Sequence, residues 1–507
     1  MNFLELHAIA APLLLTIGWA IVLLLDLSSR ALGVRRVSTT VGVVFSLLAL
    51  TSTFMLRGQL RSVFGNGIGV DGLVVTCHAI LAVISLITLL TADDFLGSFN
   101  VPKGEYRALA MFAISGAMIL SQSLDLVNVF VGVEIMSVAF YVITGYRRGH
   151  QASEEASVKY FLQGAFASAF LLFGIAMVYG SVGLAMKSAN IMPPGNSYTN
   201  FDAIFTAIRM VDGFGVSPLF VLGSIMVLVG LLFKAGLVPF HMVAPDIYQG
   251  AQAPVSAFLA TTSKVGAFAV LIRFLAIFNG MDAAKPLILV VSLCALLSIF
   301  VGNVGAANQT SVKRLLGYSS IAHAGYMSLV LVVLMAAKME NIAVPVLTFY
   351  LIGYVISTFG TFSVVSWTGS NGEDADDLSR FNGLAKRNPS AAVVMSILMF
   401  SLSGVPLTVG FIAKLELFLA LIQNGGLSIA IVALIGSAVG LYAYLRLIVA
   451  MYFKSPTNEI PVYNDGVSKL VAVSAATLAL VMGVFPSQVL LPEWRQPTQT
   501  AGEDVIQ

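Results

Sequence analysis

The sequence predicts an all-α polytopic membrane protein with about fourteen transmembrane helices, for two reasons. Of its 507 residues, 58% are hydrophobic and only 10% are charged, whereas charged residues make up about a quarter of a soluble domain. Apolar runs of about 17–25 residues also recur almost from end to end, and each can cross the roughly 30 Å hydrocarbon core of a bilayer. The net charge of only +2 argues against a nucleic-acid-binding surface.

Fourteen such runs follow one another along the chain. They cover residues 8–26, 38–56, 72–92, 107–122, 125–145, 157–186, 216–240, 254–279, 286–307, 315–337, 342–367, 391–423, 427–452 and 467–488. The segment before the first run contains Glu5 and no Lys or Arg, unlike a signal peptide, so we expect a retained span. The longest polar connections, 187–215 and 368–390, are too short for a soluble domain.

The distribution of Lys and Arg predicts the orientation in the membrane. If the spans alternate in direction, sixteen of these residues face the side of the first connection and seven face the other. Cytoplasmic connections carry the excess of positive charge. Both termini are therefore expected on the non-cytoplasmic side.

Four ionisable residues lie well inside the apolar runs: Glu134, Lys234, Lys264 and Lys414. A charge at mid-bilayer costs about 2.5–3.5 kcal/mol on insertion scales, so such residues face the interior of the bundle and are paired or hydrated. Arg273 lies near the end of its run, where we expect it to reach the interface.

The four residues have two interpretations. They form structural ion pairs that hold helices together, or they form a proton relay, since a desolvated lysine readily loses its proton. Three lysines cannot all pair statically with one carboxylate, which favours the relay. Glu134 and Lys234 are the only buried opposite charges expected to meet.

Helix-breaking residues accompany two of the lysines. Gly236 and Pro239 follow Lys234, and Gly404 and Pro406 precede Lys414. An interrupted helix within a membrane bundle needs a polar cavity or neighbouring protein for its free backbone groups, and two such helices are typical of a transport path. Because the breaks fall on opposite sides of the two lysines, they support an internal repeat only weakly.

Two histidines could extend the relay, because an imidazole both accepts and donates protons near neutral pH. They are His241 and His323, the latter close to Ser319, Ser320 and Tyr326. A hydrogen-bonded packing role is the alternative for each. The acidic stretch EDADD at 373–377 is expected to be a solvated loop. The sequence has no nucleotide-binding loop and no cysteine cluster for iron–sulfur binding.

Several long segments resemble those of one protein family. They are FVGVEIMSVAFYVITGYRR, EASVKYFLQGAFASAFLLFG, GLLFKAGLVPFHMVAPDIYQGAQAPVSAFLATTSKVGAF, KRLLGYSSIAHAGYMSLV and SLSGVPLTVGFIAKLELF. Together they resemble the antiporter-like membrane subunits of NADH–quinone oxidoreductase (respiratory complex I), over nearly the whole chain. Subunit N is the most similar of the three, given the setting of Glu134, the PDIYQGAQAPVSAF run and the lysines at Lys264 and Lys414.

The resemblance implies one membrane domain, 1–507, with two inverted five-helix repeats. Residues 1–106 would hold helices 1–3, residues 107–279 and 286–452 the repeats, and residues 467–488 helix 14. Helices 7 and 12 would be discontinuous.

The resemblance also implies roles for the buried residues. Glu134 and Lys234 would be the coupling pair, Lys264 the central relay and Lys414 the terminal proton carrier. Glu416 departs from the family pattern, in which an aromatic residue is expected. Positions two apart on a helix point about 200° from each other, so Glu416 is expected to face away from Lys414.

The resemblance further implies partners and a location. The partners would be subunits K and M and a lateral helix of subunit L, in the inner membrane of a bacterium. No cofactor is expected in this chain, and FMN, iron–sulfur clusters and quinone would belong to partner subunits. The function expected is proton translocation driven by electron transfer from NADH to quinone elsewhere in the complex. The alternatives are a subunit of a multi-subunit Na⁺/H⁺ antiporter and a purely structural membrane scaffold.

Overall fold

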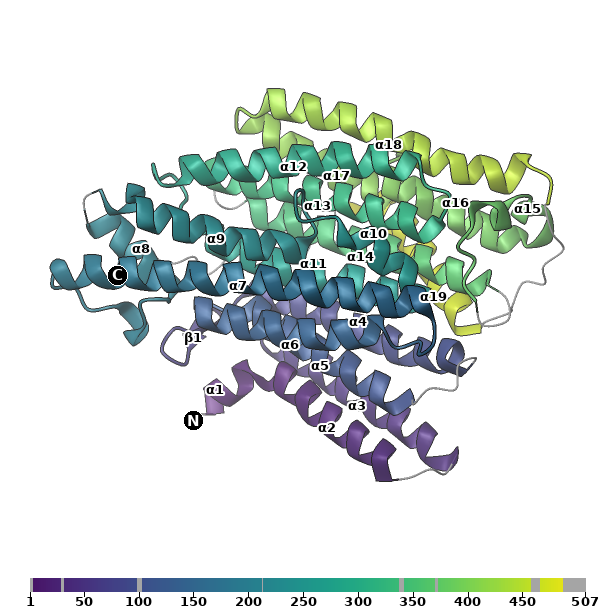
Figure 1. The fold of residues 1–507 in the computed structure, drawn as a ribbon, viewed down its shortest axis with the longest axis horizontal. Coiled ribbons are helices and arrows are strands. Elements are labelled where there is room, and N and C mark those ends of the chain that lie inside the picture. Colours follow the sequence, from purple (N-terminus) through teal and green to yellow (C-terminus); the bar gives the residue numbers. More distant parts are fainter. Residues whose placement is uncertain are drawn as a thin grey trace.

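The computed structural model describes residues 3–28, 32–97, 103–211, 213–336, 342–369, 373–456 and 466–486. This part of the chain is almost entirely helical, and its long helices form a single bundle (Figure 1). Among the described residues, twelve helices are long and apolar enough to cross a membrane. The last two residues of the final predicted span, 487–488, and the residues after it, including Arg495, lie outside the described part.

The helices agree with the predicted runs to within six residues at each end, except that the run 391–423 contains two helices. The first half contains α1 (Phe3–Ala8), α2 (Ala10–Ser28), α3 (Leu32–Met55), α4 (Gly72–Gly97), α5 (Lys103–Gln122), α6 (Leu126–Thr144), α7 (Gln151–Ser188), α8 (Phe201–Met210), α9 (Pro218–Ala235), α10 (Val243–Gly250) and α11 (Ala253–Ala276). The second half contains α12 (Ala284–Ala307), α13 (Val312–Ala336), α14 (Ala343–Trp367), α15 (Leu384–Arg387), α16 (Pro389–Ser403), α17 (Val409–Gln423), α18 (Leu427–Phe453) and α19 (Gly466–Val484). The two predicted spans outside the group of twelve correspond to α5 and to the pair α16–α17.

Some elements lie in the predicted connections. A short antiparallel hairpin of β1 (Arg61–Val63) and β2 (Ile68–Val70) joins α3 to α4. The 187–215 connection contains the short helix α8, whose cap is the Asn200 side chain bonded to the backbone N–H of Asp202 at 2.9 Å. Short 3-10 turns complete the connections, at Pro194–Asn196, Phe214–Val216 and Leu378–Phe381.

Both expected helix interruptions are present. α9 ends at Ala235, where Gly236 adopts a left-handed φ of 78° and its N–H bonds the carbonyls of the last turn. α16 ends at Ser403 in the same way, with Gly404 at a φ of 85°. Glycine adopts this conformation without the steric cost of a Cβ atom, so each glycine stops its helix inside the bundle. The inverted relation of the two halves stays a prediction.

Three helices form the interior of the bundle. All residues of α11 are buried, and α13 and α14 are buried over most of their length. In Figure 1 these helices occupy the middle, while α2 and α3 lie at one edge and α18 at the other. Small residues such as Gly266, which packs against Ala117 of α5, let neighbouring helices approach α11 closely. Polar side chains on α11 and α13 are therefore shielded from lipid.

Candidate functional site

Lys234 lies in the last turn of α9, directly before the interruption, and its side chain is buried. Its Nζ donates hydrogen bonds to Ser137 Oγ at 2.6 Å and to Tyr141 Oη at 3.4 Å, both on α6. The ammonium also lies 5.5 Å from the centre of the Tyr141 ring. Hydroxyl groups and an aromatic face thus surround this charge.

Glu134 lies on α6 one helical turn before Ser137 and is half-buried. Its carboxylate accepts a hydrogen bond from the Ser168 hydroxyl of α7. The expected direct contact with Lys234 is not formed: among the described residues no salt bridge or hydrogen bond joins the two side chains. Lys234 donates instead to Ser137, one turn after Glu134 on α6, and the Glu134 carboxylate is bonded to Ser168.

A cavity of about 50 Å³ connects Lys234 to the next lysine of the site. Its lining includes Tyr160, Lys234, Tyr248, Lys264 and Ser320. A buried water needs roughly 10–15 Å³ of such volume and two to four polar partners. The cavity has both the room and the polar groups to hold a short file of waters between the two lysines.

Lys264 lies in the middle of α11 and is buried. Its Nζ donates to Ser320 Oγ of α13 at 2.5 Å and lies 5.3 Å from the centre of the Tyr354 ring of α14. Ser320 Oγ in turn shares hydrogen bonds with Tyr354 Oη at 2.9 Å and Tyr248 Oη at 3.3 Å. A hydroxyl both donates and accepts, so Ser320 can take a proton from one neighbour and pass one to another.

His323 lies one turn after Ser320 on α13 and is also buried. Its Nδ1 is hydrogen bonded to Tyr350 Oη at 2.9 Å. Its ring centre lies 5.5 Å from that of Tyr354 and 6.1 Å from that of Tyr326. The histidine therefore lies between the surroundings of Lys264 and those of Lys414.

Lys414 lies in α17, shortly after the second interruption, and is buried. Its Nζ donates to the Ser403 carbonyl at 2.9 Å and to Ser437 Oγ of α18 at 3.0 Å. It also lies 4.8 Å from the centre of the Tyr326 ring. Ser403 is the last residue of α16, and the end of a helix leaves such carbonyls without an intrahelical partner. The interruption thus supplies the acceptor that holds this lysine.

These residues form one polar row through the interior of the bundle. From α6 to α17 it consists of Glu134, Ser137, Lys234, the cavity, Lys264, Ser320, Tyr354, His323, Tyr326 and Lys414. Hydrogen bonds and the cavity join the members from Ser137 to Tyr354, and ring contacts of 4.8–6.1 Å join those from Tyr354 to Lys414. The members Ser137 and Tyr354, and the hydroxyls of Tyr141, Tyr248 and Tyr350 that are hydrogen bonded to the row, were not among the predicted site residues. A Ser or Tyr in an apolar run is common, and only its neighbours make it part of a path.

Two other predicted residues lie beside the row. His241 is half-buried in the α9–α10 connection, it does not line the cavity, and its Nδ1 has no hydrogen-bond partner among the described residues. Glu416 is half-buried on α17 and forms no ion pair with Lys414 in the described part of the chain, as the helical angle between the two positions predicts.

The expectation for Arg273 is wrong. Its side chain is buried, and Nη2 bonds the two carboxylate oxygens of Asp71 at 2.8 and 2.7 Å, while Nε donates to the Ser121 carbonyl at 3.1 Å. Asp71 directly follows the β-hairpin and caps the start of α4 through the Val74 N–H at 2.9 Å. Asp71 directly precedes one apolar run and Arg273 lies near the end of another, but the two side chains meet inside the bundle. Glu134 and Lys234 are therefore not the only buried opposite charges.

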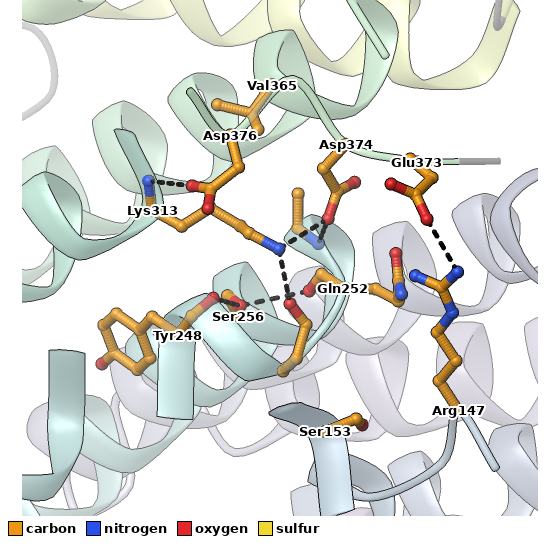
Figure 2. Close-up of polar contacts among 12 residues, drawn as sticks. Arg147, Ser153, Tyr248, Gln252, Ser256, Lys313, Val365, Glu373, Asp374 and Asp376 are labelled. Carbon is orange, nitrogen blue, oxygen red and sulfur yellow. Dashed lines mark hydrogen bonds and ion pairs between the residues drawn. The ribbon is translucent and has the colours of Figure 1, made fainter. Parts of the chain in front are cut away.

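The expectation of a solvated acidic loop at 373–377 is also wrong in part. Glu373 is exposed and pairs with Arg147 at 2.9 Å. In contrast, Asp374 and Lys313 form an ion pair at 3.0 Å with both side chains less than a tenth exposed (Figure 2). The loop packs against the starts of α11 and α13, which shields Asp374 from water.

Within the part of the chain that the structure describes, no three His, Cys, Asp or Glu side chains are grouped so as to hold a metal ion.

Comparison with known proteins gives consistent matches. Residues 123–440 match the family described as NADH:quinone oxidoreductase/Mrp antiporter, TM. NADH-quinone oxidoreductase subunit N of Chloroflexus aggregans is 35% identical over 482 residues, which cover 94% of each chain.

Solved structures share the fold. A chain of respiratory complex I from Thermus thermophilus has a TM-score of 0.77 and 31% identity, covering 95% of this chain and 98% of its own length. A chain of the Mrp complex from a Dietzia species has a TM-score of 0.79 at 19% identity, covering 97% and 96%, and this likeness concerns the fold alone. By sequence and by fold, this chain therefore belongs to the family of antiporter-like membrane subunits of NADH–quinone oxidoreductase, on the branch of subunit N.

Proposed function

We propose that this chain translocates protons across a membrane as a subunit of NADH–quinone oxidoreductase, and that the polar row is its path. The observation that carries the proposal is the row of buried lysines, hydroxyls, histidine and cavity from Lys234 to Lys414, joined by hydrogen bonds as far as Tyr354 and by ring contacts beyond it. Lys234, Lys264 and Lys414 are buried cations without a carboxylate in contact, and such charges are costly in a membrane. Proton transfer along the row explains why the protein keeps them.

The chemistry of the row supports transfer in both directions along it. A protonated Lys264 donates to Ser320, whose hydroxyl can pass a proton to Tyr354 while it receives one from the lysine. The histidine ring accepts at one nitrogen and releases from the other. Lys414, at the far end, exchanges its proton with the Ser437 hydroxyl or with water.

The coupling step that we propose acts on Lys234. The negative charge of Glu134 favours the charged form of Lys234 through space, and its withdrawal or neutralisation favours release of the proton into the cavity. Glu134 and Lys234 would then be the coupling pair, Lys264 the central relay and Lys414 the terminal carrier. The two halves, 107–279 and 286–452, each contain one interrupted helix and would be the inverted repeats.

We also propose neighbouring subunits and a membrane for this chain. The neighbours would be subunits K and M and the lateral helix of subunit L, with FMN, iron–sulfur clusters and quinone in other subunits. The membrane would be a bacterial inner membrane, with both termini on its non-cytoplasmic side, as the excess of Lys and Arg on the opposite side indicates.

A Na⁺/H⁺ antiporter subunit is the second candidate, because the Mrp complex has the same fold. The identity of 31% to the complex I chain against 19% to the Mrp chain favours the respiratory assignment. Co-purification of this chain with NADH-oxidising activity distinguishes the two.

The test of the path is Lys264→Ala in the reconstituted complex. We expect assembly and NADH oxidation by a water-soluble artificial acceptor to persist, while proton translocation per electron pair falls. Lys285→Ala is the matched control, because Lys285 is an exposed lysine paired with Asp282 at 2.7 Å. Full proton translocation by the Lys264 variant in an assembled complex would remove the row from the mechanism.

A further inference from the structure

The acidic strap, residues 373–377, caps two helices at once. Asp374 Oδ2 accepts the backbone N–H of Ala253, the first residue of α11, at 2.8 Å. Asp376 Oδ1 accepts the backbone N–H of Lys313 at 3.0 Å and the Ser311 hydroxyl at 2.6 Å, at the start of α13. The first N–H groups of a helix have no intrahelical partner, and a carboxylate there also interacts favourably with the helix dipole. One loop thus anchors the two helices that carry the centre of the polar row.

Lys313 links the strap to the junction between α10 and α11. Its Nζ donates to Asp374 Oδ2 at 3.0 Å and to the Ala251 carbonyl at 2.9 Å (Figure 2). A lysine in the first turn of a helix is opposed by the helix dipole, so this buried ammonium depends on the strap for its counter-charge. We call Lys313 and Asp374 the clamp.

The junction between α10 and α11, which the clamp holds, is also in contact with the polar row. Ser256 Oγ donates to the Tyr248 carbonyl at 2.9 Å, which holds the end of α10 against the start of α11. The Tyr248 hydroxyl is hydrogen bonded to Ser320 and its side chain lines the cavity. From the other side, Asp246 of α10 accepts from Arg314 Nη1, the residue after Lys313, at 2.5 Å. α10 is therefore held by α13 at two adjacent residues.

Simple helix geometry relates the clamp to the site. Lys264 lies eleven residues along α11 from Ala253, and Ser320 lies seven along α13 from Lys313. At 1.5 Å per residue these separations are about 16 Å and about 10 Å. Because both helices are rigid and share one anchor, a shift at the anchor changes the distance between Lys264 Nζ and Ser320 Oγ, now 2.5 Å.

We infer that Lys313 and Asp374 are positioning residues, which set the register of α11 against α13 and thereby align Lys264 with Ser320 for proton transfer. This inference rests on the proposed function of the row. Neither residue touches the transferred proton. A displacement of about 1 Å in a reacting pair can lower a rate on the order of 10²-fold, so the alignment decides whether the row conducts.

The experiment compares three variants in the full membrane complex: Asp374→Asn, the double variant Lys313→Met/Asp374→Asn, and the control Glu373→Gln. The control removes a neighbouring carboxylate whose partner is Arg147, and we expect it to pump as the wild type does. Asp374→Asn leaves a buried ammonium without its counter-charge and is expected to reduce assembly. The double variant removes both charges, so it should assemble.

The measurement is the proton-translocation rate per assembled complex, with NADH oxidation by a water-soluble acceptor as the reference for the other subunits. We expect about a tenfold or greater loss in the double variant, with the reference activity unchanged. A clamp that only balances charge would leave the double variant pumping normally, and that result would overturn the inference. Failure of both clamp variants to assemble would also overturn it, by assigning the clamp to folding alone. Normal pumping by Lys264→Ala would instead overturn the proposed function.

Discussion

The buried pair of Asp71 and Arg273 allows a quantitative test of the structure, through the substitution Asp71→Ala. The carboxylate is fully buried and the guanidinium side chain is only 4% exposed. The substitution removes the two hydrogen bonds from Arg273 Nη2 and the cap on the Val74 N–H. Arg273 keeps its Nε bond to the Ser121 carbonyl but loses its counter-charge.

The expected cost follows from the burial of the charge that remains. Removing one partner of a buried ion pair destabilises a protein by about 3–5 kcal/mol, whereas replacing both partners with apolar groups is often close to neutral. Asp71→Ala should therefore lower the free energy of unfolding by about 4 kcal/mol, roughly a thousandfold in the unfolding equilibrium. The double variant Asp71→Ala/Arg273→Met should regain most of this and retain only the loss of the α4 cap, about 1 kcal/mol.

The assay is denaturant unfolding of the purified chain in detergent micelles, arranged as a double-mutant cycle. Asp282→Ala is the matched control, because it breaks the pair with Lys285, in which both side chains are more than three-quarters exposed. Exposed pairs contribute little, so this control should unfold as the wild type does. If Asp71→Ala were no more destabilising than Asp282→Ala, or if the double variant were as unstable as the single one, the buried pair would not exist as described.

Two further predictions concern Lys414 and the exposed end of the strap. Lys414→Arg keeps a positive charge but cannot be deprotonated in practice, so the assembled complex should lose proton translocation as fully as Lys414→Ala does; normal pumping by the Arg variant would exclude this residue from the path. The hydrogen bond from Arg147 lowers the pKa of Glu373 in the folded protein. The Arg147–Glu373 ion pair therefore contributes its full stability above the ordinary glutamate pKa of about 4.3. That contribution is lost as the pH falls through the lowered pKa of the folded state. The difference in Tm between the wild type and Glu373→Gln should therefore be small and constant near neutral pH and vanish on acidification; a difference that persisted in acid would contradict the assignment.

The sequence was sufficient for most of the helical architecture and for the ionisable members of the site. Hydropathy over about twenty residues is a local signal, so each predicted run contains a helix, and the breaks at Gly236 and Gly404 could be located from single residues. Lys234, Lys264 and Lys414 stand out because charge is rare and costly in an apolar run. All three are buried in the structure, as that cost requires.

The hydroxyl members of the row were not predictable in the same way. Tyr350 and Tyr354 are ordinary residues for an apolar helix. They become part of a path only because α14 packs beside α11 and α13, which places their hydroxyls against His323 and Ser320. The direct contact expected between Glu134 and Lys234 is likewise a matter of packing, which places the Lys234 ammonium on the Ser137 hydroxyl and the Glu134 carboxylate on the Ser168 hydroxyl.

What the sequence by itself determined is therefore the membrane class, the order of the helices and the identity of the charges in the middle of the apolar runs, because these depend on the free energy of placing each segment in hydrocarbon. What only the tertiary structure decided is which charges meet. Asp71 and Arg273 are 202 residues apart, and Lys313 and Asp374 are 61 apart. Each of these four residues lies near the end of an apolar run, where its charge can be either hydrated or paired with another residue. Only the packing of the helices removes the water and leaves the partner.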